Sequence, residues 1–177
     1  PTDWNAASYD RVADPQARWG AEVLARLPLE GRETVLDAGC GTGRVTELLL
    51  GRLPRGRVVA LDASASMLEQ ARGRLAAFGD RVAYVRADLE KPVPLQETVD
   101  AVLSTATFHW VMDHDALFAN VAAVLRPNGW LVAQCGGFGN IATLLRVATE
   151  VSPGFHRIAV RLVAPEQRVR EALRSAA

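Results

Sequence analysis

Residues 34–43, which read TVLDAGCGTG, constrain the fold more than any other stretch of this sequence. A short apolar run reaches Asp37 and then breaks into three glycines at alternate positions, Gly39, Gly41 and Gly43. A pattern with helical spacing follows at once. A strand that turns through glycines into the start of a helix brings bare backbone amides close to a ligand. We therefore expect this protein to bind its ligand at this turn.

Apolar runs typical of buried strands alternate with stretches of helical spacing along the rest of the chain. The predicted strands are residues 34–38, 57–62, 82–86, 99–104 and 130–135. The predicted helices are residues 9–27, 44–53, 64–78 and 114–125. Five short strands that alternate with helices predict a parallel sheet covered on both faces. The fold class is therefore α/β, as an open doubly wound and mostly parallel sheet flanked by helices.

Two local patterns refine this outline. In the first predicted helix, Trp19 falls near the same face as Val23, Leu24 and Leu27, so we expect all four to be buried. Residues 126–129, which read RPNG, predict a turn before the last strand.

Polar residues stand where four of the predicted strands end. These residues are Asp37, Asp62, Asp88 and Ser104. In open α/β sheets the ligand binds outside the carboxyl ends of the strands, so the four side chains should converge on one site. This convergence is a stronger argument for a site than any single motif.

The spacing of the glycines narrows the classes of ligand that the turn is expected to bind. A dinucleotide fingerprint reads G-x-G-x-x-G, whereas the third glycine here comes one residue early and Arg44 takes its place. The turn also lacks the G-K-[ST] ending of a phosphate-binding loop. Asp62 follows Gly43 by 19 residues, where a carboxylate can accept both hydroxyls of a ribose. The pattern indicates a nucleoside-bearing ligand without a demanding phosphate subsite.

Composition and charge weigh against several classes of function. Lysine plus arginine equals aspartate plus glutamate at 20 each, which argues against a general nucleic-acid or membrane binder. No run approaches the roughly 18 apolar residues of a membrane span, and the first residues lack the pattern of a secretory signal. The two cysteines, Cys40 and Cys135, suit a reducing cytoplasm, and no grouping has metal-ligand spacing. We expect a cytoplasmic protein without a metal.

Three motifs in order resemble a known family. VLDAGCGTG, ALDAS and VRADL look like the first three motifs of class I S-adenosylmethionine-dependent methyltransferases. Further stretches are similar to the trans-aconitate methyltransferase-like group, namely WNxxxY at residues 4–9, LPLE at 27–30, SxxML at 64–68 and HWVxDHDALF at 109–118. The resemblance covers residues 4–139. It implies a Rossmann-like methyltransferase fold that binds S-adenosylmethionine and releases S-adenosylhomocysteine.

The resemblance implies cofactor roles at the glycine turn. The residues that would pass their backbone beneath the methionyl part of the cofactor are Gly39, Cys40 and Gly41. Asp37 would order the turn or meet the methionyl amino group. Asp62 would hold the ribose. Arg18 would meet the methionyl carboxylate, or would be an ordinary surface arginine.

The resemblance also implies an adenine subsite and a position near the sulfonium. Ala63 and Met67 would flank the adenine, although Met67 on an apolar stripe equally suits the core. Asp88 would accept a hydrogen bond from the exocyclic amine, and the amide of Leu89 would meet a ring nitrogen. Ser104 would lie near the sulfonium. A strand-end aspartate is also a common helix cap, which is the structural alternative for these carboxylates.

The acceptor side of the site would follow the fourth strand. A neutral imidazole of His109 would take a proton as the catalytic base, bind the substrate, or be a partly buried structural histidine. Trp110 would form an apolar wall of the acceptor pocket or belong to the core. Tyr9, with Trp4, would belong to an N-terminal lid that contacts the substrate.

The chain is expected to form a single domain over residues 1–177. Residues 1–30 would form the helical lid region, 31–137 the cofactor-binding core, and 138–177 an incomplete C-terminal part. In that part residues 154–163 resemble the sixth strand of the family with its lead-in, and no seventh strand follows. An exposed edge strand would permit pairing, so the protein is expected to be a monomer or a homodimer.

The function expected from all this is methyl transfer to a small molecule at a carboxylate or hydroxyl oxygen. A cofactor-binding domain without catalytic activity is the alternative from another class. A nicotinamide-dependent oxidoreductase is disfavoured by the early third glycine. A nucleic-acid or protein methyltransferase is disfavoured by the charge balance.

Overall fold

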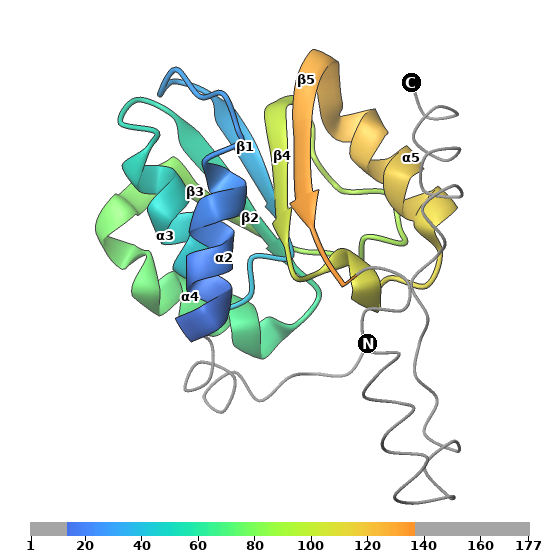
Figure 1. Cartoon of the computed structure of the whole chain (residues 1–177), viewed down its shortest axis with the longest axis horizontal. Coiled ribbons are helices and arrows are strands. Elements are labelled where there is room, and N and C mark those ends of the chain that lie inside the picture. The colour runs from blue at the N-terminus through green and yellow to red at the C-terminus, as the bar shows by residue number, and fades with distance from the viewer. Residues whose placement is uncertain (1–13, 137–177) are drawn as a thin grey trace, which may run out of the picture.

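The computed structural model describes residues 14–136, and these form one five-stranded sheet flanked by helices (Figure 1). The strands are β1 (Thr34–Ala38), β2 (Arg57–Asp62), β3 (Val82–Arg86), β4 (Val99–Thr105) and β5 (Leu125–Gln134). Their order across the sheet is β3-β2-β1-β4-β5, and every neighbouring pair is parallel. The predicted doubly wound α/β fold is therefore confirmed.

The helices of the described residues connect these strands. They are α2 (Asp14–Leu24), α3 (Arg44–Gly51), α4 (Ala65–Arg74) and α5 (His114–Val124), with short 3₁₀ segments η1 (Ala76–Arg81) and η2 (Phe108–Trp110). Ser64 starts α4 by accepting a hydrogen bond from the amide of Met67 on its side chain, and Asp113 starts α5 in the same way through Ala116. None of the described helices is long and apolar enough to cross a membrane.

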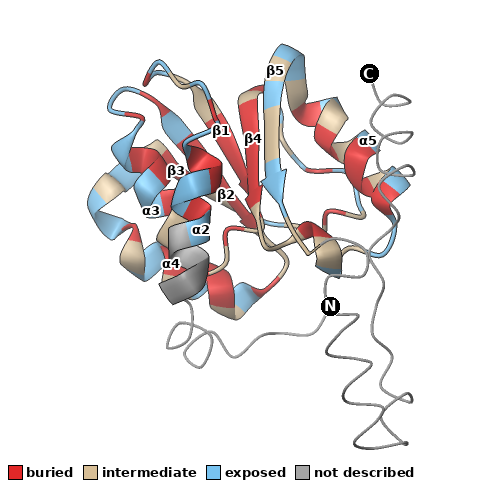
Figure 2. Ribbon diagram, in the orientation of Figure 1, coloured by how far each residue is buried: buried red, intermediate tan, exposed pale blue. Residues whose placement is uncertain are grey.

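Two hydrophobic cores lie on opposite faces of the sheet. Val35 belongs to the core shared with α2, α3 and α4, whereas its neighbour Leu36 belongs to the core shared with α5. Successive side chains of a strand point to opposite faces, so β1 contributes to both cores. Figure 2 shows β1 and β4 as largely buried strands between these layers. A strand covered on both faces is mostly apolar, which is the pattern that predicted these strands.

The first helix differs from its prediction at Trp19, which is 53% exposed, while Val23, Leu24 and Leu27 are buried. The buried stripe begins at Gly20 instead, because a Cβ at that position would lie 2.4 Å from a methyl group of Val45 in α3. The stripe therefore runs 20, 23, 24 and 27, the regular spacing of one helical face, and Trp19 lies beside it.

The fifth strand begins at Leu125 instead of Trp130. Its pairing with β4 passes from Leu125 directly to Trp130, so residues 126–129 form an irregularity within the strand instead of a turn before it. Asn128 adopts a left-handed conformation there, with φ 61°. The prediction of a turn before the strand is therefore wrong, because the chain pairs with β4 on both sides of residues 126–129.

Residues 1–13 and 137–177 lie outside the described part of the chain. The first 13 residues of the expected lid region and all of the expected C-terminal part fall there, so the predicted division of the chain stays a prediction.

Candidate functional site at the carboxyl end of the sheet

The glycine turn between β1 and α3 has three left-handed residues, with φ 88° at Gly39, 54° at Gly41 and 82° at Gly43. A side chain on Gly39 would overlap Thr107, with its Cβ only 2.1 Å from Oγ1. A Cβ on Gly43 would lie 3.3 Å from Ala71 of α4. At Gly41 a Cβ would meet nothing within 4 Å. Two of the glycines therefore permit close packing within the protein, and Gly41 borders open space where a ligand can approach.

The turn is held to the end of β2 by its own amides. The amides of Gly39 and Cys40 both donate to the Leu61 carbonyl, at 2.8 and 2.9 Å. The amide of Gly41 donates to Oδ2 of Asp62 at 2.9 Å. The expectation of bare amides at the turn is therefore wrong for these three residues, because β2 ends beneath the turn and takes up their hydrogen bonds. A ligand meets a turn that is already fixed in shape.

Asp62 stands at the end of β2 with both carboxylate oxygens engaged by backbone. Oδ1 accepts the amide of Ser64 at 2.9 Å, while Oδ2 accepts the amide of Gly41. A carboxylate oxygen can accept more than one hydrogen bond, so these contacts orient the group without exhausting it. Asp62 thus joins the turn to the start of α4, which places a fixed negative charge beside Gly41.

Asp37 is the most unusual group of the site. Its side chain is fully buried, Oδ2 accepts the hydroxyl of Thr46 at 2.6 Å, and Oδ1 has no partner among the described residues. Burial raises the pKa of Asp37 to about 6, the Thr46 hydrogen bond opposes this rise, and the charge of Asp62 adds to it. A buried oxygen without a partner is costly, and a cationic group on a ligand would offset that cost.

The end of β3 leads into a short turn at Asp88 and Leu89. Oδ1 of Asp88 accepts the amide of Glu90 at 3.0 Å, so this carboxylate caps a turn rather than a helix. Leu89 is buried, and its carbonyl accepts the side-chain amide of Asn120 from α5 at 3.0 Å. The segment expected to face the adenine is therefore attached to α5.

The segment after β4 packs against the glycine turn. Ser104 is buried and its hydroxyl donates to the Ala38 carbonyl at 2.7 Å, which joins β4 to β1. Thr107 donates to the Thr105 carbonyl at 3.0 Å, with the Gly39 carbonyl at 3.3 Å. Ala106 between them has φ 53°, an uncommon backbone conformation for a residue with a side chain. The hydroxyl of Ser104 is thus engaged by β1, and its contact with a sulfonium stays a prediction.

His109 and Trp110 lie on η2, directly after this segment. His109 is half-buried, and its Nδ1 lies 3.4 Å from the amide of Gly136, which donates to it. Burial lowers the pKa of His109, so the ring is neutral near pH 7 and its proton is on Nε2. The ring centroids of His109 and Trp110 are 4.9 Å apart, and Trp110 is 53% exposed. Trp110 is therefore not a core residue, and its expected role as a pocket wall stays a prediction.

The remaining expected site residues fall into two groups. Ala63 is half-buried beside Asp62, and Met67 is buried in α4. Tyr9 and the side chain of Arg18 lie outside the described part of the structure.

Several residues of the site were not found from the sequence. Thr46 and Thr107 contact the turn, and Glu90 and Asn120 attach the loop after β3. Of these, Thr46 could have been identified from the sequence, because it lies in the first turn of a helix that starts directly after Gly43.

Two further properties of the described residues concern the Cys40 thiol and the grouping of metal-ligating side chains. Cys40 is buried and its thiol pKa is raised well above the usual range by burial, followed by the charges of Asp37 and Asp62. Such a thiol is a filler of the turn rather than a nucleophile. Within residues 14–136, no group of three histidine, cysteine or carboxylate side chains is placed to hold a metal ion.

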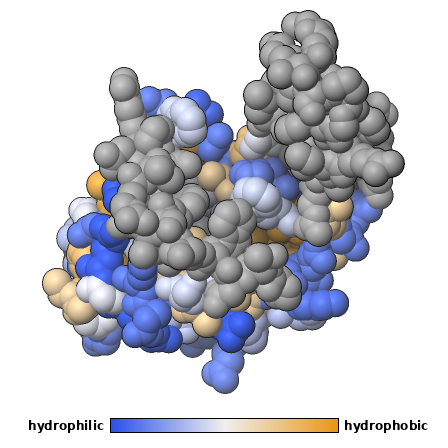
Figure 3. Space-filling view, turned by 90° about the horizontal axis from the view of Figure 1, so that it is seen from below, coloured by the Kyte–Doolittle hydropathy of each residue, from blue (hydrophilic) through white to orange (hydrophobic). Residues whose placement is uncertain are grey.

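The face that carries these residues is seen in Figure 3, from the side toward which the strand arrows of Figure 1 point. In the part of this face that is not drawn in grey, hydrophilic residues surround a hydrophobic area. A polar rim with an apolar patch is typical of a site for a small, partly polar ligand.

Residues 35–129 match the family described as methyltransferase domain. The chain belongs to this family. The trans-aconitate 2-methyltransferase of Methylobacterium radiotolerans is 39% identical over 132 residues, which are 75% of this chain and 49% of the relative. The enzyme of the same name from Paracidovorax citrulli is 41% identical over 133 residues, 75% of this chain and 50% of the relative. The chain thus spans about half the length of these curated relatives.

Solved structures agree with this assignment. An S-adenosylmethionine-dependent methyltransferase from Mesorhizobium loti is 34% identical with a TM-score of 0.60, over 70% of this chain and 55% of that one. A geranyl diphosphate methyltransferase in complex with S-adenosylmethionine has a TM-score of 0.71 at 20% identity, over 90% of this chain and 64% of that one, which shows the fold alone. The prediction of a class I S-adenosylmethionine-dependent methyltransferase fold, in the trans-aconitate methyltransferase-like group, is confirmed.

Proposed function

We propose that this chain binds S-adenosylmethionine and transfers its methyl group to a carboxylate oxygen of a small organic acid. The single observation that carries the proposal is Asp37, a fully buried carboxylate with one oxygen unpartnered among the described residues, at the base of a turn that borders open space. A cationic ligand group fits this environment, and both the ammonium and the sulfonium of the cofactor are cationic. The family to which the chain belongs supports the same ligand.

The residues of the site would divide the cofactor among themselves. Asp62, oriented by two backbone amides, would accept the ribose hydroxyls. Ala63 and Met67 would lie beside the adenine, and Asp88 and Leu89 at its edge. The turn and Asp37 would hold the methionyl part. When bound, the cofactor supplies an activated methyl group on a sulfonium, and the protein has chiefly to align the acceptor with it.

His109 supports a carboxylate as the acceptor rather than a hydroxyl. Its Nδ1 faces the Gly136 amide, so its Nε2–H is the group that is available as a hydrogen-bond donor. A donor can orient a carboxylate, which is already deprotonated near pH 7 and needs no base. A hydroxyl would need a base to remove its proton. We therefore assign His109 to substrate binding, with Trp110 as the neighbouring apolar wall.

The comparisons support the same substrate class. The relatives at 36–41% identity are named trans-aconitate 2-methyltransferase, and their substrate is a carboxylate. Trans-aconitate is therefore the first acceptor to test. The oligomeric state and the expected cytoplasmic location stay predictions.

The test uses the whole 177-residue chain in two steps. Calorimetry with S-adenosylmethionine, S-adenosylhomocysteine and NAD comes first, and binding of NAD alone would overturn the proposal. Transfer of a labelled methyl group is then measured with trans-aconitate, its trimethyl ester and a matched alcohol. We expect transfer to the free acid only. Cofactor binding without transfer to any acid would instead support the non-catalytic domain.

A further inference from the structure

His114 is a buried histidine that neither the cofactor site nor the acceptor site uses. It is the first residue of α5, and its Nε2 lies 3.0 Å from the carbonyl oxygen of Phe108. A carbonyl can only accept, so Nε2 carries the proton and donates it. Its Nδ1 is buried without a partner among the described residues. Burying a polar ring at this cost calls for a reason.

Capping of α5 does not explain why His114 is buried. Asp113 caps the helix, because its Oδ1 accepts the amide of Ala116 at 2.9 Å and its carbonyl accepts the amide of Leu117 at 3.0 Å. Among the described residues, the imidazole of His114 makes no hydrogen bond to the backbone of its own helix. The hydrogen bond that it does make crosses to η2.

Phe108 is held at both its main chain and its side chain. The carbonyl that accepts from His114 also accepts the amide of Val111 at 3.2 Å, the hydrogen bond that closes η2. The ring of Phe118 stands edge-on to Phe108 at 5.9 Å and to His114 at 6.1 Å. The residue that follows Phe108 in the chain is His109. The peptide between Phe108 and His109 is therefore held by two hydrogen bonds to its carbonyl, one from Val111 within η2 and one from His114 of α5.

Glu90 fixes the other end of the same segment. Its Oε1 accepts the amides of Met112 at 2.6 Å and Asp113 at 3.3 Å. These two contacts leave the segment between η2 and α5 little freedom to shift along the chain. The contacts that then hold η2 against α5 are the His114 hydrogen bond and the Phe108–Phe118 ring pair, and of these the hydrogen bond is the directional one.

We propose that His114 is a positioning residue, which orients η2 so that the Nε2–H of His109 and the ring of Trp110 face the methyl acceptor. The inference rests on the proposed function for the identity of the acceptor side. The orientation of η2 itself can be measured without any acceptor.

Three variants of the whole chain separate positioning from packing. H114Q places an amide donor close to the position of Nε2 and keeps the hydrogen bond. H114N carries a similar amide on a shorter side chain that does not reach the Phe108 carbonyl. H114L keeps much of the volume and removes the donor. The unfolding midpoint and the affinity for S-adenosylhomocysteine are measured for each, as checks on folding and on the cofactor site.

The decisive readouts are the nuclear magnetic resonance signals of the His109 ring and the Trp110 indole, together with kcat and KM for trans-aconitate. In H114N and H114L we expect both signals to move and kcat/KM to fall about tenfold. Affinity for S-adenosylhomocysteine should stay within about twofold, and H114Q should resemble the wild type.

Two outcomes overturn the inference. The His109 and Trp110 signals are unmoved in H114N and H114L, or H114Q is as impaired as H114L. If the wild-type chain methylates no acid, the proposed function fails, and the resonance signals still decide whether His114 orients η2.

Discussion

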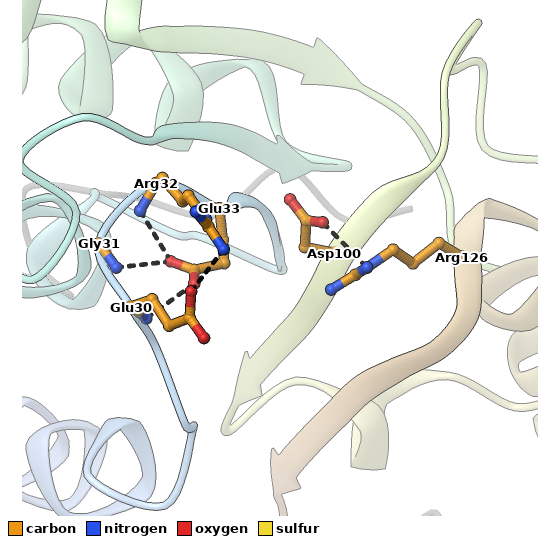
Figure 4. A network of polar contacts seen from close by, with 6 residues as sticks. All are labelled: Glu30, Gly31, Arg32, Glu33, Asp100 and Arg126. Carbon is orange, nitrogen blue, oxygen red and sulfur yellow. Dashed lines mark hydrogen bonds and ion pairs between the residues drawn. The ribbon is translucent and has the colours of Figure 1, made fainter.

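The carboxylates at the amino end of the sheet and Asp37 at its carboxyl end differ in the partners of their oxygens. At the amino ends of β1 and β4, Glu33 accepts the backbone amides of Glu30, Gly31 and Arg32 at 2.7, 2.8 and 3.0 Å (Figure 4). Asp100 accepts the amide of Thr34 at 2.7 Å on one oxygen and pairs with Arg126 at 2.9 Å on the other. Both carboxylates therefore have protein partners on both oxygens. We call Glu33, Asp100 and these partners the amino-end network.

At the carboxyl end, one oxygen of Asp37 accepts a hydrogen bond from Thr46 and the other has no partner within residues 14–136. The pKa values follow the same division. Burial acts to raise the pKa of Glu33, but the backbone amides outweigh it and the pKa is lowered. Burial raises the pKa of Asp37 to about 6. A carboxylate whose hydrogen-bond partners all come from the protein stabilises the fold. A buried carboxylate that lacks a partner on one oxygen fits a role in binding a ligand.

The largest expected effect of this difference is on stability against pH. The folded state holds the proton of Asp37 up to about pH 6, whereas the reference pKa is 3.8. Between these values the folded state binds more protons than the unfolded state, so stability falls as pH rises. The difference corresponds to roughly 3 kcal/mol lost above pH 6. Urea unfolding at pH 4 and pH 8 measures it, and Asp37→Asn should be more stable than the wild type at pH 8 but not at pH 4. Equal pH dependence in both proteins would contradict this.

The second expected effect is on cofactor binding. Asp37→Asn should weaken the affinity for S-adenosylmethionine by about 10- to 100-fold at pH 8, since hydrogen bonds to charged groups contribute about 1.5–3 kcal/mol. Calorimetry measures it, with Glu33→Gln as the matched control at the other end of the sheet, expected within about twofold of the wild type. Asp37→Asn would then stabilise the fold at pH 8 while it weakens cofactor binding, and Glu33→Gln would do neither. Equal weakening in both variants would remove the distinction.

The sequence predicted the positions of these groups better than their partners. Asp37 and Asp62 were placed at strand ends because strand boundaries are local patterns. The hydrogen bond from Gly41 to Asp62 joins residues 21 positions apart, and it depends on how β2 ends beneath the turn. Trp19 was misplaced because Gly20, which begins the buried stripe, was not counted as part of an apolar face. The sequence therefore predicted features that depend on local patterns. It did not predict contacts between elements that lie far apart in the chain.

The third prediction concerns Asp100 in the amino-end network. Asp100→Asn keeps an acceptor for the amide of Thr34 but loses the charge that pairs with Arg126. We expect a loss of about 1 kcal/mol in the free energy of unfolding, because the pair is partly exposed and screened by solvent. Cofactor affinity should not change. A drop in affinity alongside the loss in stability would show that the two ends of the sheet are coupled.

The smallest effect is expected at Glu33, with the opposite sign of pH dependence from Asp37. Its pKa is lowered from 4.5 in the folded state, so its contribution to stability is present above pH 4.5 and is lost as pH falls through the lower folded value. Because the residue is only partly buried and solvent screens its charge, Glu33→Gln should cost below about 1 kcal/mol at pH 7. Acid unfolding of this variant should therefore be less steep than that of the wild type below pH 4.5, whereas Asp37→Asn alters the range between pH 4 and 6. If both substitutions altered the same pH range, the contrast between satisfied and unsatisfied carboxylates would not explain the behaviour of the sheet.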